Sequence, residues 1–326
     1  MLFNDFIGFK YDCRVKATLE NIICYPFHTH NNILEAICVI DGSYRISNGA
    51  LEHDLSYGDV YFFNAPDTHK IERTSETGIL LTIHIDLSYF KETFSDYDGT
   101  GQYDITKTTY FICDSFYRGN IYSESIRHLR FLMAKIYMIY SDPSASSHDL
   151  EDIANEFLTH ILDYYQNYIY IKQDNGKYAI VQNKTNTGKG LQDDRFYRIT
   201  EYLIDNSTKK ITLKEIADRE YLSPNYLSSC FKKGKGLSIS ELLSVIRCEH
   251  AETLLGMTSK NLDEIASKTG LSNRSHLTNQ FKKWFGKTPS QYRKELNEDL
   301  FSENTRFESF DYDFAMRIIN SYLDGY

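Results

Sequence analysis

Three histidines and a glutamate near the N-terminus have side chains that suit metal coordination. His28 and His30 lie two residues apart, Glu35 follows, and His69 belongs to a later strand-like segment. Side chains two apart on a β-strand point to the same face, so His28 and His30 would face one interior together. With Glu35 and His69 they form a three-histidine, one-carboxylate set that suits a transition metal. The alternative, which we favour, is that they are hydrogen-bonding groups in a core or at a pocket rim, with no cofactor.

Aromatic residues are concentrated around the same segments: Tyr25, Phe27, Tyr44, Tyr57, Tyr61, Phe62 and Phe63. Aromatic walls with a few polar groups are typical of small-molecule pockets. Flat tyrosine faces favour a sugar or a similar polyol as the ligand, whereas Arg45 favours a carboxylate, and the sequence leaves this choice open. The predicted effector pocket consists of His28, His30, Glu35, Tyr44, Arg45 and His69.

The C-terminal half contains one motif twice. Residues 213–233 read LKEIADREYLSPNYLSSCFKK, and residues 262–283 read LDEIASKTGLSNRSHLTNQFKK. Both begin Leu-x-Glu-Ile-Ala, continue with Leu-Ser and end with Phe-Lys-Lys. The copies are 49 residues apart at the serines and 50 at the final lysines, so the second copy contains a one-residue insertion. This register indicates a duplicated structural unit.

Each copy is predicted to form two short helices with a tight break at Tyr221 or Gly270. Ser223 and Ser272 are the expected caps of the second helices, and Pro224 suits a first helical position. In a helix-turn-helix the second helix enters the major groove, about 12 Å wide, where Arg and Asn read base edges and Lys neutralises phosphates. The outward candidates for DNA contact are Asn225, Ser228, Ser229, Lys232, Arg274, Ser275, Thr278, Asn279 and Lys282.

The duplicated region is basic within an acidic chain. Residues 209–294 contain 16 Lys+Arg and 8 Asp+Glu, a surplus of +8. The whole chain carries −9, so the remainder carries −17. Between the copies, ISELLSVIRCEHAETLL (239–255) has an apolar stripe at helical spacing and is predicted to be a rigid bridge. Two matched copies, a bridging helix and a basic surplus together indicate a DNA reader far more strongly than one copy would.

Residues 196–294 resemble the DNA-binding domain of AraC/XylS-type transcription regulators. The matching positions are Ile216, Ala217, Leu222, Ser223, Leu227, Phe231, Gly236, Arg247, Ala251, Leu255, Ile265, Ala266, Gly270, Phe281, Phe285, Gly286, Pro289, Tyr292 and Arg293. The resemblance implies that the outward residues above lie where the family contacts bases. It also implies promoter DNA and RNA polymerase as partners, and activation more often than repression.

In the N-terminal half, the histidine spacing together with Gly42, Gly58 and Pro66 resembles the two motifs of the cupin β-barrel. This barrel is the usual sensor of AraC-type regulators, and regulatory versions often keep the histidines without a metal. The resemblance therefore implies a small-molecule effector, for which a carbohydrate is a frequent choice in the family. A homodimer is the expected assembly.

The expected fold class is α+β multidomain: a cupin-like β-barrel with two packing helices, then an all-α domain of two helix-turn-helix units joined by a linker helix. The helices are predicted at 124–140 and 150–165 from their apolar periodicity; they either cover their own barrel or form a dimer interface. The predicted domains are 1–171 (sensing and dimerisation; strands in 1–115, helices in 120–170), 172–194 (polar linker), 195–295 (DNA-binding) and 296–326 (acidic extension).

Composition is typical of a soluble, cytoplasmic protein. The six cysteines are scattered, with no pair at a spacing typical of a metal or redox site, which indicates reduced thiols. There is no run of about 18 apolar residues to span a bilayer, and no secretory signal is evident at the start. A membrane partner is therefore not expected.

The predicted function is a sequence-specific DNA-binding transcription regulator that responds to a small-molecule effector and is not an enzyme. Two alternatives stay open: a metal-dependent cupin enzyme fused to a DNA-binding domain, and a regulator controlled by a protein partner without a small ligand. The acidic extension departs from the family, whose chains usually end earlier. Its apolar helix face either docks on its own protein, or the extension lies near the basic surface and weakens DNA binding. That face consists of Phe314, Ile318, Ile319, Tyr322 and Leu323.

Overall fold

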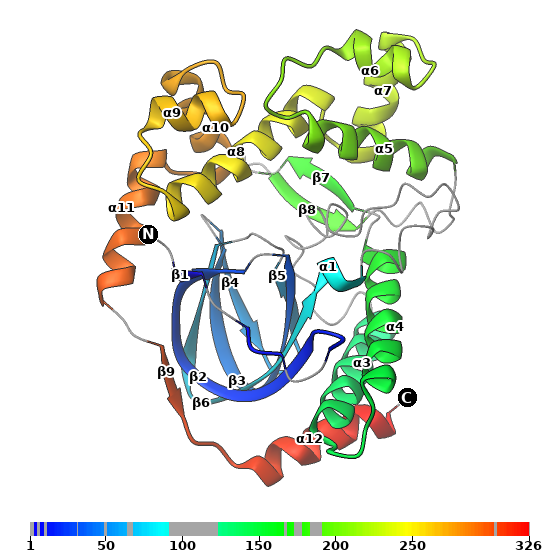
Figure 1. The fold of residues 1–326 in the computed structure, drawn as a ribbon, viewed down its shortest axis with the longest axis vertical. Helices are drawn as coiled ribbons and strands as arrows, with labels where there is room; N and C mark the ends of the chain where they lie inside the picture. Colours follow the sequence, from blue (N-terminus) through cyan, green and yellow to red (C-terminus); the bar gives the residue numbers. More distant parts are fainter. Residues whose placement is uncertain are drawn as a thin grey trace. The chain divides into compact units, whose positions relative to one another are not determined.

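The chain forms two compact units, shown in Figure 1. The N-terminal unit comprises residues 2–166 together with 298–326, and the helical unit comprises residues 167–297. No helix in the described part of the chain combines the length and apolar composition that crossing a bilayer requires. The computed structural model describes residues 3–4, 7–9, 12–30, 32–48, 51–63, 68–90, 123–165, 168–172, 178–182, 191–302 and 305–325.

The N-terminal unit is built on a sheet of seven described strands, mostly antiparallel. The strand order is β1-β2-β6-β3-β4, while β5 pairs with β3 and β9 pairs with β2. A short helix, α1 (Leu87–Phe90), follows β6, and residues 91–122 lie outside the described part of the predicted strand region. The strands are β1 (Phe3–Asn4), β2 (Val15–Thr29), β3 (Ile33–Asn48), β4 (Leu51–Ser56), β5 (Val60–Phe63), β6 (His69–Asp86) and β9 (Arg306–Glu308).

The sheet is rolled, because the two ends of β6 meet at one side chain. Along a straight strand, His69 and His84 would lie about 50 Å apart, at roughly 3.3 Å per residue. Instead, His69 Nε2 lies 2.9 Å from one carboxylate oxygen of Glu35, and His84 Nε2 lies 3.8 Å from the other. β6 and its neighbours must therefore curve until their ends face each other (Figure 1). This roll agrees with the barrel expected from the sequence, while its cupin-like character stays a prediction.

Paired glycines lie where β3 and β6 curve together. Gly42 pairs with Gly78, and the pairing register shifts on both sides of Gly42. Such irregularities bend a strand and increase its twist. Gly42 has a φ of 72°, and a β-carbon there would lie 2.1 Å from the carbonyl oxygen of Thr77. Only glycine fits this position without displacing the neighbouring strand.

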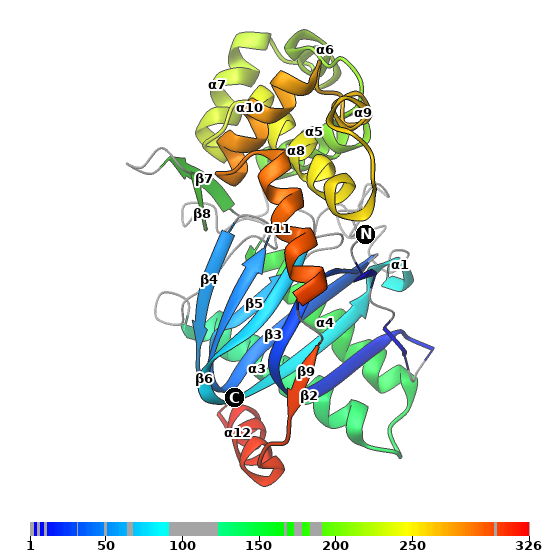
Figure 2. The ribbon, with the colours of Figure 1, turned by 90° about the vertical axis from the view of Figure 1, so that its left-hand side faces the viewer.

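Helices α3 (Ser123–Ser141) and α4 (Ser147–Tyr165) pack on each other and on the sheet. Figures 1 and 2 show them along one side of the rolled strands. Both helices predicted from apolar periodicity are confirmed, and their apolar faces are buried within this unit. A role for them in dimerisation stays a prediction. The buried residues are Ile126, Leu129, Met133, Ile136, Leu150, Ile153, Phe157, Ile161 and Leu162.

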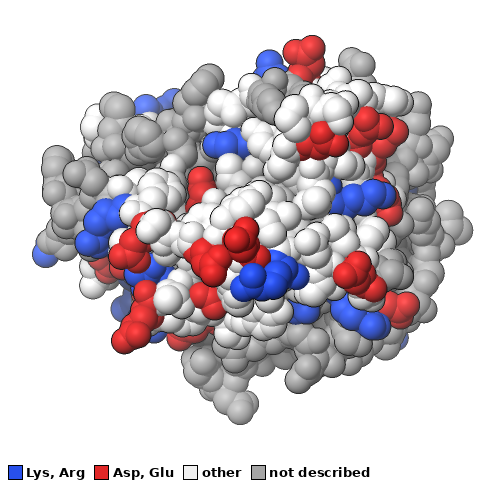
Figure 3. All heavy atoms as spheres, turned by 90° about the horizontal axis from the view of Figure 1, so that it is seen from below, with Lys and Arg blue, Asp and Glu red and all other residues white. Residues whose placement is uncertain are grey.

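The C-terminal extension returns to the N-terminal unit. Its strand β9 pairs with β2, and its helix α12 (Tyr312–Asp324) packs on α3 and β3, burying Ala315 and Ile319. Figure 2 shows β9 beside β2. The extension therefore docks as a helix on its own protein, the first of the two alternatives drawn from its composition. Among the described residues on the face shown in Figure 3, acidic and basic side chains are interspersed.

The helical unit begins with a two-stranded hairpin. This hairpin, β7 (Tyr168–Lys172) and β8 (Tyr178–Gln182), overlaps the polar linker predicted at 172–194. The segment YAIVQ contains aromatic and β-branched residues, which favour a strand over the coil that its polar neighbours indicated. The helices are α5 (Leu191–Asp205), α6 (Leu213–Arg219), α7 (Pro224–Lys235), α8 (Ile239–Met257), α9 (Leu262–Lys268), α10 (Arg274–Phe285) and α11 (Pro289–Ser302).

Candidate nucleic-acid interface and buried histidine cluster

The two copies of the sequence motif fold as two helix-turn-helix units, α6–α7 and α9–α10. Ser223 caps α7 as predicted, because its side chain accepts a hydrogen bond from the backbone N–H of Tyr226, and Pro224 occupies the first turn. In the second unit the cap is Asn273, which accepts from the N–H of His276, so the prediction for Ser272 is wrong. Asn caps helices as well as Ser does. The inserted residue therefore lies in the turn, immediately before α10.

The turns of the two units have the same backbone form but different residues. Tyr221 has a φ of 55° and Gly270 a φ of 75°, both in the left-handed region. In each turn the next N–H reaches back to the first helix: Leu222 donates to the Ala217 carbonyl at 2.8 Å, and the equivalent bond in the second unit is 2.9 Å. Glycine adopts this conformation without steric strain, whereas tyrosine is strained there. Tyr221 is also 95% exposed, so little packing offsets the strain.

The predicted DNA contacts lie on the outer faces of α7 and α10. Ser228 and Thr278, which occupy equivalent positions, are half-buried. The opposite faces are buried through Leu227 and Phe231 in α7 and the matching pair in α10. The arrangement leaves two helices, each with a polar and basic outer surface. The exposed candidates are Asn225, Ser229, Lys232, Arg274, Ser275, Asn279 and Lys282.

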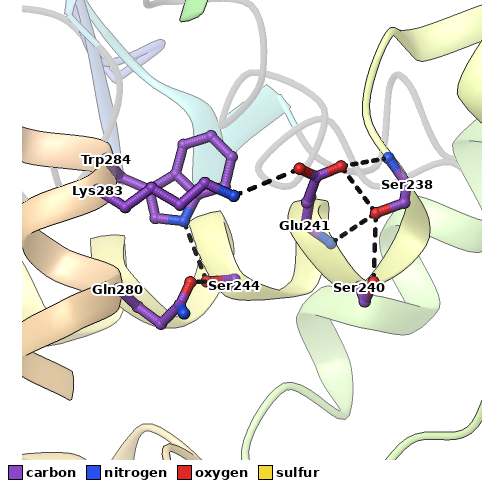
Figure 4. A network of polar contacts seen from close by, with 7 residues as sticks. All are labelled: Ser238, Ser240, Glu241, Ser244, Gln280, Lys283 and Trp284. Atoms are coloured by element: carbon purple, nitrogen blue, oxygen red, sulfur yellow. Dashed lines mark hydrogen bonds and ion pairs between the residues drawn. The ribbon is translucent and has the colours of Figure 1, made fainter. Parts of the chain in front are cut away.

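A polar network holds α10 against the linker helix α8 (Figure 4). The indole N–H of Trp284 donates to Ser244 Oγ at 3.0 Å, and that hydroxyl donates to Gln280 Oε1 at 2.6 Å. One turn earlier on α8, Glu241 Oε1 accepts from Lys283 Nζ at 3.3 Å. The other oxygen of Glu241 closes the capping box at the start of α8. These residues were not predicted from the sequence. Ser244 meets Gln280 and Trp284 only because α8 and α10 pack against each other in the folded protein.

Arg247 joins α8 to the segment that precedes the first unit. Its guanidinium donates to the carbonyl oxygens of Ser207 and Lys209, each at 2.7 Å. Burial lowers the pKa of Arg247 from its usual value, yet an arginine stays protonated in proteins. Nearby, Glu220 accepts from Arg198 at 2.8 Å and ties α5 to the end of α6. The first helix-turn-helix unit is therefore tied to α5 and α8, and the second is tied to α8.

The second candidate site is the buried cluster that the sequence predicted inside the rolled sheet. His28, His30, Glu35 and His69 are all buried, and their possible ligand atoms lie within 4.8 Å of one another. The carboxylate accepts from His30 Nε2 at 3.0 Å and from His69 Nε2 at 2.9 Å. His28 Nδ1 donates to the Pro26 carbonyl at 2.8 Å, which leaves its Nε2 as the lone-pair nitrogen.

Two further residues border this cluster: His84, which the sequence analysis did not name, and Phe63, one of the aromatic residues expected around it. His84 approaches Glu35 from the far end of β6, and the ring of Phe63 stacks on that of His69 with centroids 3.8 Å apart. The signal for His84 is its position as a polar residue between the isoleucines of the apolar segment GILLTIHID. Its involvement became visible only once the sheet was rolled.

Burial and mutual charge decide the ionisation of the cluster. Burial alone would raise the pKa of Glu35, but the charge of His69 and the hydrogen bonds from His30 and His69 hold it well below its usual range. Burial, reinforced by the charge of His69, keeps the pKa of His28 well below its ordinary value. Burial likewise lowers the pKa of His84 to about 3. At neutral pH the site therefore presents an ionised carboxylate together with the neutral imidazoles of His28 and His84.

The other two residues of the predicted effector pocket lie elsewhere. Tyr44 is fully buried in the apolar core with Ile37, Val39 and Leu80. Arg45, the next residue on β3, points to the opposite face and pairs with Asp54 at 2.8 Å. The alternation of side chains along a strand separates these neighbours. The structure thus brings four of the six predicted pocket residues together.

Most of the helical unit matches a known family of DNA-binding domains. Residues 216–295 match the helix-turn-helix domain family. The chain carries an AraC-type helix-turn-helix domain. The match begins within α6 and ends within α11, so the AraC-type domain contains both duplicated units and the α8 bridge.

Relatives match mainly through this domain. Over 96 residues the chain is 36% identical to the bifunctional transcriptional activator/DNA repair enzyme AdaA of Bacillus subtilis, covering 29% of this chain and 46% of that protein. Over 133 residues it is 29% identical to the regulatory protein PocR of Salmonella typhimurium, covering 41% and 43%. The chain thus spans less than half of each relative. The structure of ToxT from Vibrio cholerae aligns with 86% of this chain and 98% of that one, at 11% identity and a TM-score of 0.43.

We expect Tyr221→Gly to stabilise the AraC-type domain. A left-handed backbone costs a non-glycine residue about 1–2 kcal/mol, and glycine costs about 0.5–1 kcal/mol in chain entropy, so a net gain of about 0.5–1 kcal/mol follows. Tyr221→Ala is the matched control, because it removes the exposed ring and keeps the strain. Urea unfolding of both variants measures the difference. Equal midpoints for the glycine and alanine variants would mean that the strain only offsets the chain entropy that glycine adds, and would contradict the expected gain; a more stable alanine variant would show that the strain is negligible.

Proposed function

We propose that the protein is a transcription regulator that binds promoter DNA through α7 and α10 and binds a small-molecule effector inside the rolled sheet. The observation that carries the proposal is the pair of helix-turn-helix units on the shared helix α8. A unit on each side of one bridge suits a site spanning two successive major grooves, about 34 Å apart. The surplus of +8 over residues 209–294 supports attraction to a phosphate backbone.

The two reading helices differ in the chemistry that they present. α10 exposes Arg274 and Asn279, whose side chains make bidentate contacts to guanine and adenine. α7 exposes Asn225 and Ser229 followed by Lys232, a set better suited to phosphate and water-mediated contacts. We therefore assign most of the direct base reading to the second unit and most of the positioning to the first.

The buried cluster supports an effector site in the N-terminal unit. A carboxylate among imidazoles offers both acceptors and donors, a pattern that suits the hydroxyl groups of a sugar or polyol. An effector changes DNA binding only if it prefers one arrangement of the protein over another. A cytoplasmic homodimer that activates transcription by contacting RNA polymerase completes the proposal, in line with the family resemblance.

We expect Arg274→Ala and Asn279→Ala each to weaken binding of the full chain to its selected duplex by about 10- to 100-fold, since a bidentate base contact is worth about 1–3 kcal/mol. Binding to random duplexes should change much less. Lys232→Ala is the control for phosphate contacts: it should weaken both kinds of binding equally and reduce the salt slope by about one. Competition titrations at several salt concentrations measure these effects. Equal losses on selected and random duplexes would contradict base reading by α10.

A second candidate function is favoured by the convergence of His28, His30, Glu35 and His69. Three imidazoles and a carboxylate within 4.8 Å fit a transition metal, and His28 presents the nitrogen that a metal would need. Such an ion would supply Lewis-acid chemistry, as in a metal-dependent enzyme fused to a DNA-binding domain. Against it stands the internal pairing of Glu35 with His30 and His69, which already satisfies the carboxylate.

Elemental analysis of untagged, purified protein separates these two candidates. We expect a metal content far below one ion per chain, because the cluster is stabilised by its own hydrogen bonds. Glu35→Ala and His128→Ala serve as a pair, the first inside the cluster and the second on α3, outside it. One transition-metal ion per chain that Glu35→Ala removes and His128→Ala retains would favour the metal-dependent function instead.

A further inference from the structure

A second set of shielded polar atoms lies beside the histidine cluster, on the inner face of the rolled sheet. We propose that these atoms complete the effector site and that its ligand is a sugar acid. The hydroxyl groups of this ligand are held by Thr18, Thr82 and His84. Its carboxylate pairs with Lys16. The inference rests on the proposed effector site in the N-terminal unit and names the chemical class of its ligand.

The strand pairing places these residues in two neighbouring rows across the sheet. His84 on β6 pairs with Lys16 on β2 and with Glu35 on β3. Two residues earlier on β6, Thr82 pairs with Thr18 on β2. Paired residues, and residues two apart on one strand, share a face of the sheet. The first row crosses three strands, about 10 Å, and the second row lies about 7 Å from it. The two rows together match one monosaccharide in extent.

This face is the inner one, because Glu35 lies there within the histidine cluster. Thr82 and His84 are only 2% and 7% exposed, whereas Lys16 and Thr18 are half-buried. Among the described strands, residues 15–20 of β2 pair with β6 alone, so they form an edge of the sheet. A small molecule on these rows would therefore have one end buried beside the cluster and the other end close to solvent.

Three polar atoms in the two rows have no hydrogen-bond partner within the described part of the chain. They are Oγ1 of Thr18, Oγ1 of Thr82 and Nδ1 of His84, and all three are shielded from solvent. Threonines that face each other across two strands can share a hydrogen bond, but no such bond joins this pair. Buried polar groups in native proteins almost always have a partner, so each exception calls for an explanation such as a bound molecule. Two hydroxyls and an imidazole nitrogen suit a ligand with several hydroxyl groups.

His84 connects these rows to the cluster. Its Nε2 lies 3.8 Å from a carboxylate oxygen of Glu35. The unpartnered Nδ1 belongs to the same ring. One nitrogen therefore faces the cluster, and the other can bond to a ligand that extends from the cluster toward β2.

Lys16 supplies a positive charge at the outer end of the first row. It forms no ion pair with any described residue, and a lysine ammonium is a compact point charge that suits an anion. The ionised carboxylate of Glu35 lies on the same row. Its repulsion of a second negative charge favours a singly charged carboxylate over a doubly charged phosphate. Arg45, the residue for which the sequence favoured a carboxylate, is engaged with Asp54 on the opposite face.

The sequence left open a choice between a sugar and a carboxylate as the ligand. The unpartnered hydroxyls favour the first and Lys16 favours the second, and both face the same side of the sheet. A sugar acid carries both groups on one molecule. Its class is thereby set by residues of β2 and β6 that the sequence analysis did not name.

Sugars that differ in one carboxylate test the proposal on the full chain. The probes are D-galacturonate with D-galactose, D-glucuronate with D-glucose, and D-gluconate with D-glucitol, each at millimolar concentration. Isothermal titration calorimetry measures binding, and scanning calorimetry measures the unfolding temperature. We expect an acid of this panel to bind about tenfold or more tightly than its neutral partner, since a hydrogen bond to a charged group is worth more than one to a neutral group.

Two variants assign the contacts. Lys16→Met keeps the aliphatic stem and removes the charge, so it should reduce the affinity for the acid to that for the neutral partner. Lys135→Met, on α3, is the matched control and should leave both affinities unchanged. Thr82→Val removes a hydroxyl while keeping the side-chain shape, and should weaken binding of the acid about tenfold. It should leave the unfolding temperature of the free protein equal or higher, because an unpartnered buried hydroxyl is lost.

The outcomes separate this inference from the proposed function. Neutral sugars that bind as tightly as the acids, with no effect of Lys16→Met, would overturn the sugar acid and keep an effector site. A lower unfolding temperature of Thr82→Val with unchanged binding would assign its hydroxyl to the fold and also overturn the proposal, as would a panel in which no acid binds. An acid that binds without changing DNA affinity in competition titrations would keep the ligand class and refute the effector role.

Discussion

Helix α8 is the element on which the whole DNA-reading arrangement depends. Its buried face accepts helices from both duplicated units, and its polar edge adds directional contacts through Ser244 and Glu241 toward α10. Arg247 binds two backbone carbonyls of the segment before α6 with a planar set of donors, which fixes direction as well as distance. Since side chains on one helix cannot slide independently, the separation of α7 and α10 is set by the length of α8.

A comparable constraint organises the N-terminal unit, where a curled sheet encloses a charged carboxylate. A buried carboxylate is expensive unless it is paired, and Glu35 meets this requirement with hydrogen bonds from His30 and His69. The pairing in turn needs both ends of β6 to reach Glu35, which the strands achieve by bending at the Gly42–Gly78 pair. The same contacts that stabilise the roll therefore create a polar interior site.

The C-terminal extension connects the AraC-type domain to the N-terminal unit along the chain. It leaves the AraC-type domain through α11 and ends as a strand and a helix on the N-terminal unit. Its acidic composition by itself favoured two opposite interpretations. Packing decided between them: Ala315 and Ile319, four residues apart on α12, face a buried surface, while Asp313 and Asp324 remain exposed.

Local pattern in the sequence determined a large part of this protein. The duplicated motif predicted two helix-turn-helix units, the position of α8 and the cap at Ser223, because propensities, caps and apolar spacing act over a few residues. Four members of the histidine cluster were also predicted from spacing and residue type. Ser272 was assigned as a cap wrongly, because a one-residue insertion leaves the helical pattern intact and moves only its start.

Only the tertiary structure decided which distant residues meet. His84 reaches Glu35 because the sheet rolls, Arg45 is excluded because its neighbour Tyr44 takes the inner face, and Trp284 finds Ser244 because two helices cross. β9 pairs with β2 although Cys24 and Arg306, which face each other, lie 282 positions apart in the sequence. Such contacts depend on how many helices and strands pack together. A local sequence pattern predicts only the helix, strand or turn in which it lies.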